Sequence, residues 1–71
     1  MADSVYRVTE LIGTSTQSWE AAAKHAIETA AKSLRELRVA EVVEQDMTID
    51  AGKVTSYRVK LNVSFKYEPE K

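Results

Sequence analysis

The clearest pattern in the sequence is a regular alternation of apolar and polar residues from Val54 to Tyr67. One face of this segment would carry Tyr57, Val59, Leu61, Val63, Phe65 and Tyr67. The other face would carry Arg58, Lys60, Asn62, Ser64 and Lys66. A period of two residues is typical of a β-strand. The pattern therefore predicts a strand with one core face and one polar face.

Two earlier segments predict a strand followed by a helix. Residues 4–12, SVYRVTELI, are rich in β-branched and aromatic residues, and Gly13 then permits a turn. Apolar residues recur at three- and four-residue steps from Trp19 to Leu37, which predicts an amphipathic helix. Residues 14–16, TST, are candidate N-caps for it. The middle of the apolar stripe is mostly alanine, so we expect this helix to lie close to a sheet.

A further strand is predicted over Val39 to Ile49, and the turn sequence DAGK joins it to the last strand as a hairpin. The order strand, helix, strand, strand predicts an α+β fold of β-α-β-β type. The helix allows the first two strands to run parallel, while the last strand is antiparallel to its hairpin partner. One compact arrangement places the last strand in the centre, with the helix on one face of the sheet and the other face bare.

The segment LRVAEVVEQDM, residues 37–47, does not alternate cleanly. Val39 and Val43 would point to one face, and Ala40 and Val42 to the other. A strand that is apolar on both faces fits a position between a covering helix and a second subunit. We therefore expect the bare face to meet another copy, at least locally.

Composition supports this expectation of an oligomer. The chain has 71 residues, which predicts one domain over residues 1–71 with a small core. It has no cysteine and one histidine, so disulfides and His- or Cys-rich metal sites are excluded as stabilising elements. Oligomerisation is the remaining way to bury more apolar surface.

Charge and hydropathy exclude several classes of partner. The formal net charge is −1 with no basic cluster, so we expect no nucleic-acid partner. No apolar run approaches the roughly 20 residues of a membrane span. The first residues, MADSVYRV, lack the pattern of a signal peptide, so we expect a cytoplasmic protein. We also expect no enzyme, since no nucleophile with an adjacent base and no phosphate-binding loop is present.

Glu44 and Asp46 are the candidate metal ligands. Carboxylates two residues apart on a strand project from the same face and can converge on one hard cation. Calcium, with about 6–8 oxygen ligands in a loose geometry, is preferred to magnesium. In the alternative, the two carboxylates are solvated or paired with Lys60 or Arg58 across the hairpin.

The chain resembles the dodecin family in three successive segments. These are YRVTELIGTSTQSWEAAAKHAI, VAEVVEQ and SYRVKLNVSFKYE, which stand where the family has its first strand and helix, its second strand and its last strand. The resemblance implies a hollow, spherical homododecamer with a three-stranded antiparallel sheet partly wrapped around one helix. It also implies the binding, storage or buffering of small ligands, which in many dodecins are flavins stacked between tryptophans.

The sequence departs from the family's flavin-binding pattern. Val39, Gln45 and Arg58 stand at family flavin-pocket positions, and Val39 replaces the stacking tryptophan. A valine has no π-face, so we do not expect flavin to be the ligand here. The sequence therefore predicts a dodecin-like oligomer that binds a divalent cation. The alternatives are a remodelled pocket for flavin, FMN or coenzyme A, and a purely structural oligomer.

Overall fold

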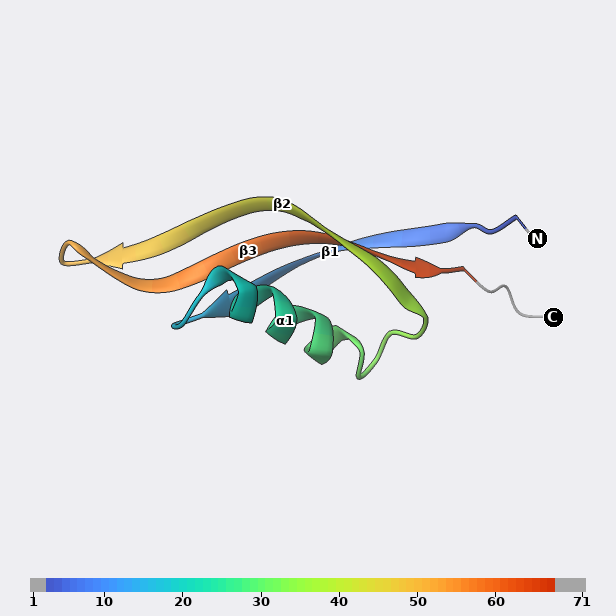
Figure 1. Cartoon of the computed structure of the whole chain (residues 1–71), viewed down its shortest axis with the longest axis horizontal. Coiled ribbons are helices and arrows are strands. Elements are labelled where there is room, and N and C mark those ends of the chain that lie inside the picture. The colour runs from blue at the N-terminus through green and yellow to red at the C-terminus, as the bar shows by residue number, and fades with distance from the viewer. Residues whose placement is uncertain (1–2, 68–71) are drawn as a thin grey trace.

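The chain folds into one three-stranded sheet with one helix on a single face (Figure 1). This computed structural model describes residues 3–67. Its elements are β1 (Tyr6–Ser15), α1 (Trp19–Ala30), β2 (Leu37–Asp50) and β3 (Lys53–Lys66). The strand order is β1-β3-β2, and β3 is antiparallel to both neighbours. The predicted β-α-β-β order and the central position of the last strand are confirmed.

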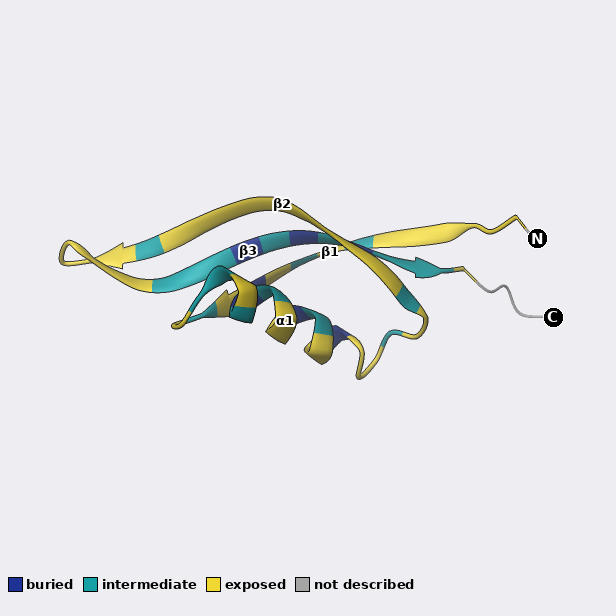
Figure 2. Cartoon of the chain, viewed as in Figure 1, coloured by how far each residue is buried: buried dark blue, intermediate teal, exposed yellow. Residues whose placement is uncertain are grey.

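The core lies between α1 and the centre of β3 (Figure 2). Val59, Leu61 and Val63 of β3 are each 1% exposed, and they pack against the helix alanines Ala22 and Ala26. The predicted core face of the last strand is therefore confirmed at its centre, while Tyr57 and Phe65 are half-buried and Tyr67 is exposed. Alanine side chains are small, so α1 lies close to β3. Because each alanine buries little apolar area, this contact contributes modestly to stability.

Gly13 allows the helix to approach this closely. The structure places Gly13 inside β1, opposite Val59, rather than in the turn predicted after Ile12. A Cβ atom at Gly13 would lie 2.2 Å from the backbone oxygen of Ala22 and 2.9 Å from the Cβ of Ala26. The glycine is thus required by contact with α1, and β1 continues through it to Ser15.

The ends of α1 differ from the prediction. Its N-cap is Ser18, whose side chain accepts a hydrogen bond from the N–H of Ala21 at 3.0 Å. The predicted caps at 14–16 are wrong, because β1 extends over the first two of these residues.

The predicted extension of the helix to Leu37 is also wrong. α1 has 12 residues, Glu36 has a left-handed φ of 62°, and Leu37 begins β2 while packing against the same core. No helix in residues 3–67 is long and apolar enough to cross a membrane.

A tight turn joins β2 and β3, as the sequence DAGK predicts. Ala51 and Gly52 both have positive φ values, 52° and 77°, as in a two-residue type I′ hairpin turn. The hairpin extends well past the start of α1, so its end has no helix beside it (Figure 1). The molecule is accordingly elongated, with extents of 54 × 20 × 16 Å.

Substituting Gly13 by alanine should destabilise the fold strongly. The added methyl group would collide with the backbone of α1, and we expect a loss of about 3 kcal/mol in the free energy of unfolding. Gly52→Ala is the matched control, because a Cβ there meets nothing within 4 Å and its penalty of roughly 1 kcal/mol comes from positive φ alone. Denaturant titrations at equal protein concentration measure both; equal losses in the two variants would contradict the proposed steric role.

Candidate functional site

A β-bulge in β2 determines which way the acidic residues point. The register between β2 and β3 shifts between Val42, which lies opposite Leu61, and Glu44, which lies opposite Lys60. Cross-strand partners share one face of a sheet, so Val42 is on the helix side and Glu44 is on the other side. We call the side away from α1 the outer face. Without the bulge, strict alternation would have carried Glu44 to the helix side with Val42.

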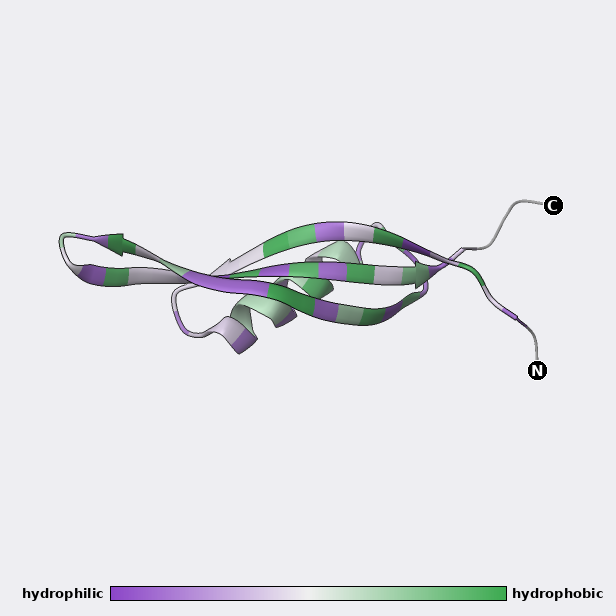
Figure 3. Cartoon of the chain, turned by 90° about the horizontal axis from the view of Figure 1, so that it is seen from above, coloured by the Kyte–Doolittle hydropathy of each residue, from purple (hydrophilic) through white to green (hydrophobic). Residues whose placement is uncertain are grey.

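The outer face carries a compact charged cluster formed by Glu44, Asp46, Arg58 and Lys60. Asp46 lies opposite Arg58 in the register, two positions beyond the Glu44–Lys60 pair. Together with Ile12 of β1, these four side chains line a depression of about 130 Å³. The lining of the depression therefore comes from all three strands. Figure 3 looks at the sheet with α1 behind it and shows hydrophobic and hydrophilic residues alternating along the central strand.

Arg58 and Asp46 form a two-pronged ion pair. The guanidinium donates from Nε to Oδ1 at 2.8 Å and from Nη2 to Oδ2 at 2.9 Å. Lys60 is held more loosely, with its Nζ 3.7 Å from a carboxylate oxygen of Glu10 on β1. Asp46 thus pairs with Arg58 across the hairpin, as the alternative interpretation of the two acidic residues predicts. Glu10, which the sequence pattern did not single out, lies beside the cluster and contacts it through Lys60.

The backbone of Asp46 is fixed from the opposite side of the sheet. The indole N–H of Trp19 donates to the backbone oxygen of Asp46 at 3.0 Å. The Trp19 ring also packs edge-on against Tyr57, with ring centres 5.1 Å apart at 70°. Trp19 packs against the core, which agrees with its place on the apolar stripe of the predicted helix, and its link to Asp46 is an additional finding. The indole N–H of a half-buried tryptophan usually finds an acceptor, and the sequence alone does not say which one.

The ion pair changes the acidity of both partners. The hydrogen bonds from Arg58, together with its charge, hold the pKa of Asp46 below its usual range. Asp46 raises the pKa of Arg58 in the same way. The side chains of Asp46 and Arg58 are 50% and 43% exposed. Solvent therefore screens the ion pair, and its contribution to stability is small.

The three family flavin-pocket positions do not meet within one chain. Val39 lies on the outer face opposite Ser64 and is 63% exposed. Gln45 lies opposite Val59, on the helix side, and Arg58 is bound to Asp46. Any pocket that used all three residues would have to be assembled from more than one chain.

The described residues of a single chain do not supply a complete metal site either. Glu44 and Asp46 line one depression, but no group of three or more His, Cys, Asp or Glu residues gathers within residues 3–67. Calcium needs about 6–8 oxygen ligands, and two carboxylates supply at most four. Further ligands would have to come from water or from another copy.

Comparison with known proteins identifies the family. The dodecin family model matches residues 5–68. The chain belongs to the dodecin family. It is 57% identical to the calcium dodecin of Mycobacterium tuberculosis over 67 residues. That alignment covers 93% of each chain. It is 44% identical over 64 residues to the dodecin of Thermus thermophilus, which covers 90% of this chain and 93% of that one.

Solved dodecin structures have the same fold. Dodecin from Streptomyces coelicolor superposes with a TM-score of 0.92 at 34% identity, over 99% of this chain and all of that one. The M. tuberculosis calcium dodecin, described as calcium-chelating with a novel calcium-binding site, superposes with a TM-score of 0.81 at 52% identity. That match covers 96% of this chain and 97% of the other. The predicted family and fold are confirmed.

The Asp46–Arg58 pair predicts a specific titration behaviour. Because Arg58 favours the carboxylate, the pKa of Asp46 should lie below the unfolded value of about 3.9. The pair's stabilisation is therefore present above that value and is lost as the pH falls through the lower folded-state pKa. Carbon-13 NMR of labelled aspartate carboxyls would measure this. Arg58→Gln should return the pKa of Asp46 towards its usual range, while Arg7→Gln should not; a normal pKa in the unsubstituted protein would contradict the pairing.

Proposed function

We propose that this protein forms a dodecin-type homododecamer that binds a divalent cation, preferably calcium, with Glu44 and Asp46 among its ligands. The observation that carries this proposal is the bulge in β2, which brings both carboxylates to one depression on the outer face. The 57% identity to a protein named calcium dodecin supports the choice of ion. Dodecins are binding proteins, so we propose binding rather than catalysis.

The exposed apolar surface supports the assembly. Only Ala22, Ala26, Ala30, Val59, Leu61 and Val63 form the buried apolar set of the described residues. β2 meanwhile exposes apolar side chains on both faces, including Val39 at 63%, Val42 at 52% and Met47 at 43%. Leaving this much apolar surface in water is unfavourable. Dodecin family proteins form homododecamers, and we propose that the assembly of this chain covers β2.

The donor set fits a hard, oxygen-binding cation. The described cluster contains carboxylates but no thiol, and His25 lies elsewhere, on the exposed side of α1. Carboxylate oxygens suit calcium and magnesium, and calcium tolerates the irregular geometry that ligands from several chains and water would give. A bound ion would draw the two carboxylates together and offset their mutual repulsion.

The flavin, FMN and coenzyme A alternatives have less support. Val39 presents no aromatic ring for stacking, and Gln45 faces the opposite side of the sheet. A purely structural oligomer is the outcome expected if neither cation nor cofactor binds.

Native mass spectrometry tests the assembly. At micromolar concentration we expect a species of twelve copies of the 7.9 kDa chain. Replacing Val42 by glutamate should favour smaller species, because a charge on an apolar contact surface is costly to desolvate. A monomeric unsubstituted protein would contradict the proposed assembly.

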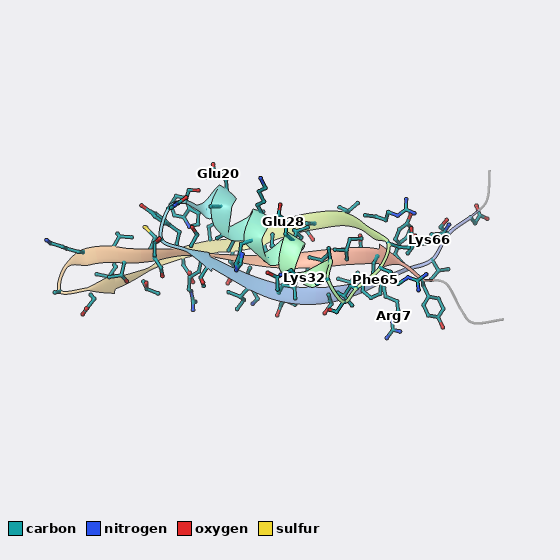
Figure 4. The ribbon with its side chains drawn as sticks, turned by 90° about the horizontal axis from the view of Figure 1, so that it is seen from below. Arg7, Glu20, Glu28, Lys32, Phe65 and Lys66 are labelled. Carbon is teal, nitrogen blue, oxygen red and sulfur yellow. The ribbon has the colours of Figure 1, made fainter. Side chains whose placement is uncertain are left out.

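Calorimetry with calcium tests the ligand. Chelator-treated protein should release or absorb heat on titration, and the double variant Glu44→Gln/Asp46→Asn should lose at least tenfold in affinity, or about 1.4 kcal/mol. Glu20→Gln/Glu28→Gln removes the same charge from α1, on the helix side of the sheet (Figure 4), and should bind as the unsubstituted protein does. Equal binding by the two double variants would reject the assigned ligands.

A further inference from the structure

We propose that Arg58 is a built-in competitor for the cation, a counter-ion that occupies Asp46 and must be displaced before a divalent ion binds there. This inference rests on the proposed function, since it concerns the regulation of the same site. It assigns Arg58 a role in selecting divalent over monovalent cations.

The geometry of the ion pair makes the competition direct. Arg58 engages both oxygens of Asp46, at 2.8 and 2.9 Å, and so uses the same atoms that a cation would bind. Calcium approaches carboxylate oxygens to 2.3–2.6 Å. A guanidinium and a divalent ion on the same carboxylate would be only a few ångströms apart, and their repulsion favours the release of one of them.

Arg58 is the partner that can move. The backbone oxygen of Asp46 is held by Trp19 from the helix side, so the main chain that carries the carboxylate is anchored. Arg58 has a long, flexible side chain that is 43% exposed, and it can swing into solvent. The backbone of Asp46 thus stays in position while Arg58 moves away into solvent.

Glu44 differs from Asp46 in this respect. Its cross-strand partner Lys60 lies 3.7 Å from a carboxylate oxygen of Glu10, and Lys60 is therefore shared with β1. An incoming ion would meet the more available carboxylate of Glu44 first and then compete for Asp46. A monovalent ion that replaces Arg58 at Asp46 gains little electrostatic energy, because it exchanges one positive charge for another. A divalent ion is attracted more strongly by the two carboxylates. The competition therefore favours divalent over monovalent ions.

The test compares calcium affinity in the full-length protein and in three variants. Arg58→Gln should bind calcium about tenfold more tightly, because the competing charge and both of its hydrogen bonds are removed. Arg58→Lys should be intermediate, since lysine has no planar pair of donors. Arg7→Gln is the matched control at the other end of the sheet, near Phe65 and Lys66 (Figure 4), and should leave the affinity unchanged.

A second measurement needs no variant. The Nε–H resonance of Arg58, followed by nitrogen-15 NMR, should move to the position of a solvated arginine when calcium saturates the unsubstituted protein. An unmoved resonance at saturation, or equal affinities for Arg58→Gln and the unsubstituted protein, would overturn the inference and leave the proposed function intact. If neither protein binds calcium, both the function and the inference fail.

Discussion

The distance between α1 and the sheet is the constraint on which the rest of this structure depends. Gly13 has no side chain, and a methyl group there would collide with the backbone oxygen of Ala22. The helix can therefore lie almost directly on β1 and β3, with alanines at the contact. Close packing of this kind orders the chain, but it buries few large side chains. The three largest fully buried residues, Val59, Leu61 and Val63, all belong to β3.

A consequence of this close packing is that the helix covers only part of the sheet. β2 and the end of the hairpin remain open on both sides, and their apolar residues are exposed in the single chain (Figure 2). A short chain without disulfides has few other ways to gain stability than contact with copies of itself. The composition, the thin core and the family all favour the same solution, an oligomer.

The local geometry of β2 turns this strand into the candidate site. One extra residue near Val43 reverses the faces of the strand from Glu44 to Thr48 and places Glu44 and Asp46 on the outer face. There they meet Lys60 and Arg58, so the cluster carries two negative and two positive side chains. A site with such internal compensation stays neutral without a ligand and still contains the oxygens that a cation prefers. Trp19 connects the site to the core by holding the backbone of Asp46.

The sequence by itself determined the order of the elements, the buried face of β3 and the family, because these follow from hydrophobic periodicity and from motifs spread over the whole chain. It also indicated Glu44 and Asp46 as a pair and Arg58 as a possible partner. Only the tertiary structure decided that Gly13 lies within a strand, that Ser18 caps the helix and that Leu37 belongs to β2. The places of Gly13 and Leu37 depend on contacts with other elements, which local propensity does not record. Ser18 becomes the cap because β1 runs on through Ser15. The bulge is the most consequential case, since a shift of one residue reverses the faces of a strand. It arises from pairing with β3, and so only the folded sheet decided which side the carboxylates occupy.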